Sequence, residues 1–199
     1  KQAAEIMRKG GLIAFPTDSA YALGGITGDN ALLARIRRIR RVDERHHFTL
    51  ICRDLSDIAT YARVDNSQYR LLKATTPGPY TFILEGTKEL PRRVLHPKRK
   101  TIGLRVPEHA VVLALLAELE GPLLTSTLLL PGEELPLTDP EEIRERMEKL
   151  VDLVIEAGPC GAQATTVIDL SSGTPQLVRE GRGALAPFGP YRKIAPWAS

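Results

Sequence analysis

The sequence has few aromatic residues and few cysteines. Aromatic side chains make up 5% of its 199 residues, with one tryptophan, and there are two cysteines. Cys52 and Cys160 lie far apart in the chain and match no metal-ligand spacing. We therefore expect no metal site and free thiols in a reducing compartment, with a structural disulfide as the less favoured alternative.

Long apolar runs are also missing. No stretch is long enough to cross a membrane, and the chain has no signal-peptide core. These absences predict a soluble, cytoplasmic protein without a membrane partner. Because the chain begins at Lys1 inside a helical pattern, we expect further residues upstream of it in the natural protein.

Several catalytic signatures are missing too. The chain has no Walker A sequence, no Gly-x-Gly-x-x-Gly after a strand, no His-Glu-x-x-His and no Cys-x-x-Cys. His46 and His47 are adjacent, so on a strand their rings would face opposite sides and would not share a metal. The chemistry of this chain must therefore come from groups outside these motifs.

The composition that is present suits a folded domain. Hydrophobic residues make up 43% of the chain and charged residues 26%, and the formal net charge is +3. Helical and strand patterns alternate, and strands follow one another directly late in the chain. This predicts an α/β fold with a mixed parallel and antiparallel sheet. The length predicts one domain, residues 1–189, followed by a loosely held tail, residues 190–199.

A candidate site follows the first predicted strand. Gly10 and Gly11 end a helical pattern, residues 12–15 form a short apolar strand, and Pro16 ends it. The loop at 17–21 then carries small hydroxyls and a carboxylate and closes on the glycine pair at 24–25. Such a loop suits a small-molecule or phosphate site. The alternative is a plain strand-to-helix connection in which Asp18 or Ser19 caps the helix.

Cations gather in two blocks. Residues 35–47 contain six arginines and two histidines, and residues 92–100 form a second basic block. Arginine suits phosphate and carboxylate groups, although a solvated helix face remains an alternative for the first block. Arg105 lies in an otherwise apolar strand, where a buried guanidinium needs an anion, unless that side of the strand faces solvent. Hydroxyls at strand ends, together with arginines, predict a groove for a carboxylate or polyphosphate, and its residues are Thr17, Ser19, Arg40, Arg105, Ser126, Thr127, Thr165, Thr166 and Arg179.

These motifs resemble a known family. Pro-Thr-Asp at 16–18, followed by Tyr-x-Leu-Gly at 21–24, is similar to the N-terminal signature of the YrdC/Sua-type threonylcarbamoyl-AMP synthase superfamily. Further matches lie at 76–84, 102–107, 165–169 and 178–181, and the resemblance runs from about residue 6 to residue 188. The segments 48–55 and 128–132 resemble the YciO-type branch. The resemblance implies a YrdC-like twisted mixed sheet, flanked by helices around a large, positively charged concave groove.

The resemblance also implies a reaction. Relatives condense L-threonine, bicarbonate and ATP, with Mg²⁺, into threonylcarbamoyl-adenylate and pyrophosphate for the t6A modification of tRNA. ATP would then be a substrate, with no permanent cofactor. The resemblance implies catalytic roles for Arg40 and Thr127, substrate binding by Thr17, Arg105 and Thr166, and nucleotide binding by Thr101, Thr125, Thr165 and Arg179.

The chain departs from the family at its active-site tetrad. The synthases use Lys-x-Arg and Ser-x-Asn, and these positions correspond to Arg40, Val42, Thr127 and Leu129. Val42 and Leu129 cannot make polar contacts, and losing two contacts of about 1–3 kcal/mol each predicts activity that is tens to thousands of times lower. Arg41 and Arg45 are candidates to compensate.

Two other functions remain open at this point. An RNA-binding module would use the basic blocks to contact the phosphates of tRNA or double-stranded RNA, through Arg37, Arg38, Arg41, Arg92, Arg93, Lys98, Arg99 and Lys100. A regulatory paralogue would bind an adenylate without turning it over. The sequence leaves the true substrate and the oligomeric state open.

Overall fold

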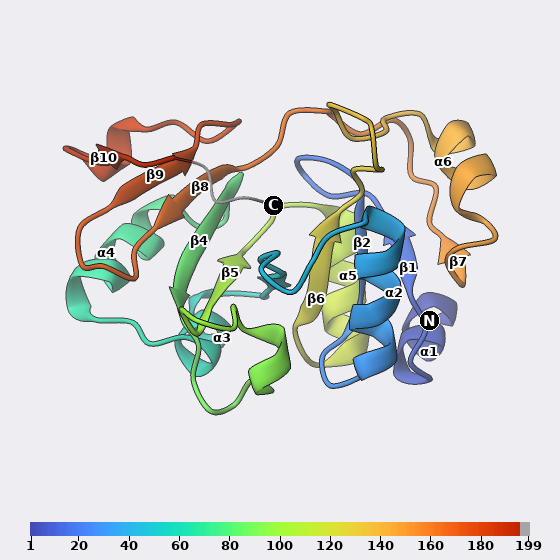
Figure 1. The fold of residues 1–199 in the computed structure, drawn as a ribbon, viewed down its shortest axis with the longest axis horizontal. Helices are drawn as coiled ribbons and strands as arrows, with labels where there is room; N and C mark the ends of the chain where they lie inside the picture. The colour runs from blue at the N-terminus through green and yellow to red at the C-terminus, as the bar shows by residue number, and fades with distance from the viewer. Residues whose placement is uncertain (196–199) are drawn as a thin grey trace.

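A computed structural model describes residues 1–195 of the chain. In this part of the chain, ten strands form one sheet in the order β10-β9-β8-β4-β5-β3-β6-β2-β1-β7 (Figure 1). The strands are β1 (Ile13–Phe15), β2 (Ala22–Ile26), β3 (Thr49–Ile51), β4 (Tyr80–Glu85), β5 (Thr101–Arg105), β6 (Leu123–Thr127), β7 (Leu153–Val154), β8 (Thr166–Asp169), β9 (Gln176–Arg179) and β10 (Arg192–Lys193).

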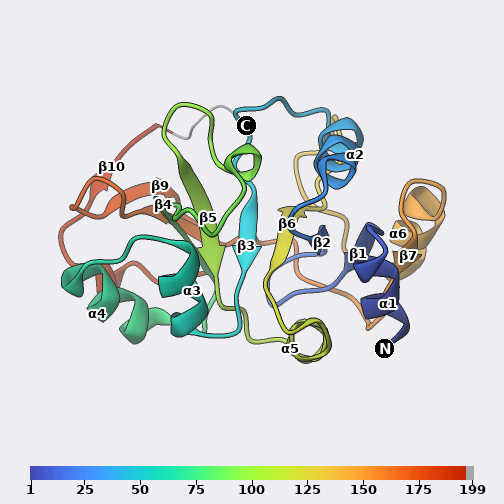
Figure 2. The same cartoon turned by 90° about the horizontal axis from the view of Figure 1, so that it is seen from below.

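The strand pairing confirms the predicted mixed sheet. The pairs β1·β7, β3·β5, β4·β8 and β9·β10 are parallel, and the other neighbours are antiparallel. The helices are α1 (Gln2–Arg8), α2 (Asn30–Arg40), α3 (Leu55–Tyr61), α4 (Asn66–Thr75), α5 (Ala110–Leu119) and α6 (Pro140–Met147), with short 3₁₀ turns η1 (Arg92–Val94) and η2 (Ala186–Phe188). Figure 2 shows α3, α4 and α5 on one side of the sheet and α2 on the other.

Strand β1 is buried on both faces, as its unbroken apolar sequence requires. Ala14 belongs to the cluster that contains the apolar side chains of α2, whereas Ile13 and Phe15 pack with those of α5. This alternation follows from the period of two along a strand. Strand β1 therefore packs between helix α2 on one face of the sheet and helix α5 on the other.

Two local expectations from the sequence are wrong, namely Asn30 as the N-cap of the helix that follows it and a loop that closes on Gly24 and Gly25. The N-cap of α2 is Asp29, whose carboxylate accepts a hydrogen bond from the Ala31 amide at 2.7 Å, and Asn30 is the first helical residue. Gly24 and Gly25 do not close a loop but lie inside β2. A Cβ atom at Gly24 would come within 2.9 Å of Thr125 Cγ2, so close strand packing explains this glycine.

The end of the chain contains a short strand. Within the predicted tail, Arg192–Lys193 pairs with Gln176 and Leu177 of β9, and residues 196–199 lie outside the described part. The loose attachment of residues 190–199 stays a prediction. No helix in the described chain is both long and apolar enough to cross a membrane.

Candidate anion-binding cavity

A cavity of about 550 Å³ lies where several strands begin or end. Thr127 ends β6, Arg105 ends β5 and Arg179 ends β9, and all three side chains line the cavity. Of the nine residues predicted for catalysis, substrate or nucleotide, seven line it, namely Thr17, Arg40, Arg105, Thr125, Thr127, Thr165 and Arg179. Its charged lining consists of Arg40, Arg45, Arg105, Arg179 and one carboxylate, Glu134, besides the histidines.

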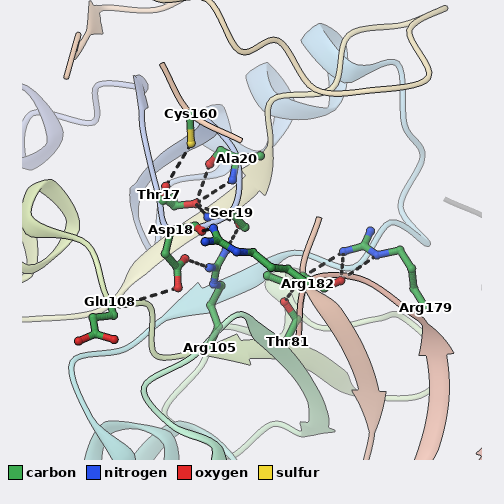
Figure 3. Close-up of polar contacts among 11 residues, drawn as sticks. Thr17, Asp18, Ser19, Ala20, Thr81, Arg105, Glu108, Cys160, Arg179 and Arg182 are labelled. Carbon is green, nitrogen blue, oxygen red and sulfur yellow. Dashed lines mark hydrogen bonds and ion pairs between the residues drawn. The ribbon is translucent and has the colours of Figure 1, made fainter. Parts of the chain in front are cut away.

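The loop after β1 is closed by its own hydroxyl groups. Thr17 Oγ1 donates to the Ala20 carbonyl at 2.6 Å and accepts from the Ser19 amide at 3.2 Å (Figure 3). The thiol of Cys160 donates to the Thr17 carbonyl at 3.1 Å. Thr17 is 3% exposed, so its hydroxyl mainly shapes the loop.

Arg105 is buried and forms an ion pair with Asp18 (Figure 3). Arg105 Nη1 also donates to Ser19 Oγ at 3.1 Å, and the other oxygen of Asp18 accepts from the Glu108 amide at 3.3 Å. Burial lowers the pKa of Arg105, and Asp18 opposes this shift. The carboxylate balances the guanidinium, so this arginine fixes the loop and leaves little charge for a guest.

Arg40 has a different environment. Its Nε donates to the Leu129 carbonyl at 3.1 Å, and its Nη1 donates to Ser126 Oγ at 2.8 Å and lies 3.2 Å from His46 Nε2. Among the described residues, no carboxylate forms an ion pair with it. Burial, followed by the charge of Arg179, lowers the pKa of Arg40 to about 10. A largely buried cation with neutral partners therefore faces the cavity.

Arg179 lies on the opposite half of the sheet and is held by one threonine. Its Nε and Nη2 donate to the Thr165 carbonyl at 3.1 and 3.0 Å, and Nη2 also lies 3.2 Å from Thr165 Oγ1. Thr81 Oγ1 lies 2.8 Å from the same hydroxyl (Figure 3). Burial, followed by the charge of Arg105, lowers the pKa of Arg179. Arg179 thus approaches the cavity from the end of strand β9, and Arg40 from the end of helix α2.

Two predicted residues do not line the cavity. Thr166, predicted to bind substrate, is 0% exposed; its hydroxyl donates to the Gly183 carbonyl at 2.7 Å and accepts from the Gly181 amide at 3.0 Å. Thr101, predicted to bind nucleotide, is buried, and its Oγ1 lies 3.0 Å from Nε2 of His47, which does line the cavity. Both hydroxyls therefore make hydrogen bonds within the protein.

Of the four positions matched to the tetrad, Arg40 and Leu129 are in contact, Thr127 lines the cavity and Val42 does not. The backbone carbonyl of Leu129 contacts Arg40, while its side chain adds an apolar part to the lining. Arg41 is the left-handed C-cap of α2 and is exposed. Of the two arginines considered as compensation, only Arg45 lines the cavity.

The residues predicted for RNA binding lie outside the cavity lining. Arg37 sits over the Phe48 ring, with 5.2 Å to its centroid, and Arg99 pairs with buried Asp169 at 2.6 Å. Arg93 donates to the Gly28 carbonyl and so links the second basic block to the turn before α2. Arg38, Arg41, Arg92, Lys98 and Lys100 are exposed.

Sequence reasoning missed the partners that organise the site. The sequence places His46 in the first basic block and in a histidine pair that would not share a metal, and it does not point to Thr81 as a site residue. Their signal is weak because a lone histidine or threonine is uninformative without its neighbours. Among the described residues, no group of three metal-ligating side chains is present, and both cysteines are free.

Comparison with known proteins defines the family. Residues 5–181 match the Sua5/YciO/YrdC family model, which carries the description telomere recombination. The chain is 56% identical over 187 residues to the protein YciO of Escherichia coli, covering 94% of this chain and 91% of that protein. It is 31% identical over 183 residues to the human threonylcarbamoyl-AMP synthase, covering 88% of this chain and 64% of the human protein. The chain belongs to the Sua5/YciO/YrdC family.

Solved structures agree with this assignment. The crystal structure of E. coli YciO matches with a TM-score of 0.91, covering 94% of this chain and 91% of that one. The structure of P. abyssi Sua5 complexed with L-threonine matches with a TM-score of 0.88 at 26% identity, covering 97% of this chain and 58% of that one. The predicted family and its α/β fold are confirmed.

Proposed function

We propose that the cavity binds an adenine nucleotide together with L-threonine or a similar small carboxylate, as in a threonylcarbamoyl-AMP synthase. In that reaction the amine of L-threonine adds to bicarbonate with loss of water and gives a carbamate. A carbamate oxygen then attacks the α-phosphorus of ATP and displaces pyrophosphate. Mg²⁺ would enter with ATP as part of the substrate.

The observation that carries the proposal is that Arg40 lines the cavity and is held only by neutral groups. Burying a guanidinium without a carboxylate is unfavourable, so a protein that keeps one in a cavity has prepared it for an anionic guest. Arg40 keeps its neutral partners at Ser126 and Leu129 and has no ion pair among the described residues. A phosphate would supply the missing negative charge.

Positioned cations and hydroxyls suit such a reaction. Arg40 and Arg179 would neutralise phosphate oxygens, and Thr125 and Thr127 would offer hydroxyls along β6. The Arg105–Asp18 pair would keep the loop at 17–20 in shape. Val42 and Leu129 remove two polar contacts, so we expect turnover that is tens to thousands of times slower than that of a synthase with the full tetrad.

A pyrophosphate-release assay tests the proposal. Release should require ATP, bicarbonate and L-threonine together, and Arg40→Ala should abolish it. A threonylcarbamoyl-AMP synthase assayed in parallel provides the positive control. Nucleotide binding without release would favour a regulatory adenylate-binding protein, and the absence of both in the wild type would overturn the proposal.

RNA binding is the second candidate function, and one contact favours it. The stacked rings of His47 and His96, with 4.8 Å between their centroids, bring the two basic blocks together, and Arg45 lines the cavity. Replacing exposed Arg38, Arg41, Arg92 and Lys98 with alanine should weaken tRNA binding and flatten its salt dependence, with nucleotide binding unchanged. A salt dependence that the four substitutions leave unchanged would exclude this surface.

A further inference from the structure

We propose that His46 is a positioning residue, which holds Arg40 toward the anionic guest by acting as a neutral hydrogen-bond acceptor. The identity of the guest rests on the proposed function. The link between His46 and Arg40 does not, because it consists of contacts within the chain. No motif of the sequence assigns His46 a role.

Three side chains form a closed cluster at this point. His46 Nε2 lies 2.9 Å from Ser126 Oγ and 3.2 Å from Arg40 Nη1, and Arg40 Nη1 lies 2.8 Å from the same serine oxygen. A guanidinium can only donate, so Nε2 must accept. We therefore assign the ring proton of His46 to Nδ1. Ser126 then accepts from Arg40, and the hydroxyl of Ser126 and Nη1 of Arg40 share the single lone pair of His46 Nε2.

The surroundings keep His46 uncharged. Burial, followed by the positive charges of Arg40, His47 and Arg37, lowers the pKa of His46 to about 3, against a small opposing effect of Asp43. A protonated ring would also point an N–H at the guanidinium and break the cluster. Near neutral pH, His46 therefore offers a lone pair and no charge.

Neutrality matters because it leaves the charge of Arg40 available. Arg105 is held by the carboxylate of Asp18, which cancels its charge. Arg40 is instead held by an imidazole, a hydroxyl and a backbone carbonyl. In the same cavity, Arg105 is thus neutralised by a carboxylate, whereas Arg40 is oriented without one.

His46 itself is well fixed. It belongs to the segment after α2, and its ring meets Phe48 edge-on, with 5.4 Å between the ring centroids. Its amide donates to the Asp43 carbonyl at 3.2 Å. A fixed acceptor restricts the rotamers of a long arginine side chain, which would otherwise lose that freedom when a ligand binds.

Two substitutions test separately the hydrogen-bond acceptor of His46 and the packing of its ring. His46→Gln keeps an acceptor at about the place of Nε2, whereas His46→Leu keeps apolar packing on Phe48 and removes the acceptor. His96→Leu is the matched control, because His96 is outside the cavity lining. Folding of each variant is checked by urea unfolding.

The first measurement uses no nucleotide. Phenylglyoxal modifies free guanidinium groups, and mass spectrometry follows its reaction at Arg40, with exposed Arg192 as the internal reference. We expect modification of Arg40 to become at least about threefold faster in His46→Leu and to stay within about twofold of wild type in His46→Gln and His96→Leu, as for loss of one modest hydrogen bond. Equal rates in wild type and His46→Leu would overturn the inference.

The second measurement is ATP and AMP binding by calorimetry. We expect His46→Leu to weaken binding about tenfold, His46→Gln to restore most of it, and the effect of His46→Leu to vanish in an Arg40→Ala background. Additive effects in the double variant would contradict the inference. If wild-type protein binds neither nucleotide while the phenylglyoxal result holds, the proposed function fails and the positioning role of His46 stands.

Discussion

Arg40 Nε donates a hydrogen bond to the backbone carbonyl of Leu129 at 3.1 Å, which joins two positions that the family resemblance matches to the lysine and the asparagine of the synthase tetrad. The contact is made by a backbone carbonyl, which no side-chain substitution can remove.

Removal of the Arg40 side chain should weaken nucleotide binding. We expect Arg40→Ala to raise the Kd for ATP at least about tenfold, because a charge-assisted contact in a buried site is lost. Arg40→Lys should recover part of the affinity, since it keeps the charge but not the fork of donors. Calorimetry measures both, with exposed Arg38→Ala as the control. Equal Kd values for Arg40→Ala and wild type would contradict this.

Restoring the tetrad should raise turnover. In the double variant Val42→Arg, Leu129→Asn, two polar contacts return, and we expect pyrophosphate release to rise at least about tenfold. Leu129→Ala provides the control, because it changes the volume without adding a polar group. A double variant that folds, binds ATP and shows no gain would mean that other differences limit the reaction.

Breaking the Asp18–Arg105 pair should reduce stability. Asp18→Asn leaves a buried guanidinium uncompensated, and we expect the free energy of unfolding to fall by about 3 kcal/mol. Glu85→Gln removes one partner of the solvent-exposed Arg63–Glu85 pair, whose side chains are 3.6 Å apart, and should change stability by less than about 1 kcal/mol. Urea unfolding compares the two. Similar losses of unfolding free energy in both variants would show that the buried Asp18–Arg105 pair contributes no more to stability than an exposed pair.

The adjacent threonines should behave differently. Thr165→Val removes the hydroxyl that contacts Arg179 and Thr81 in the cavity, so ATP binding should weaken several-fold. Thr166→Val removes two buried hydrogen bonds to residues 181 and 183 and should lower stability by about 1–3 kcal/mol, with the Kd for ATP unchanged. If Thr166→Val weakened ATP binding without lowering stability, Thr166 would be a binding residue.

Stability should fall as the pH falls below about 6.5. Burial is the main cause that lowers the pKa of His46 to about 3 and that of His47 to about 4, so the unfolded chain binds more protons between these values and 6.5. The free energy of unfolding therefore rises with pH in this window, by on the order of 1–2 kcal/mol per histidine between pH 5 and 7. His46→Gln should flatten the dependence in urea unfolding. An unchanged slope would show that His46 titrates normally.

The sequence by itself determined much of the fold. Leu12 to Phe15 form an unbroken apolar run before Pro16, which suits a strand buried on both faces, and Asp65 and Asp139 are N-caps because their carboxylates can reach the first amides of a helix. The order of the family motifs identified the family, and with it the cavity that seven of nine predicted residues line. These features depend on local chemistry and on motif order, which the chain displays directly.

Only the tertiary structure decided how the charges are used. Arg105 and Arg40 look alike in sequence, but one meets Asp18 across 87 positions and the other meets Ser126 across 86. Thr165 and Thr166 are neighbours, yet only the first lines the cavity. The burial and partners of a side chain depend on segments that are remote in sequence, and these set whether a guanidinium is neutralised or left for an anion.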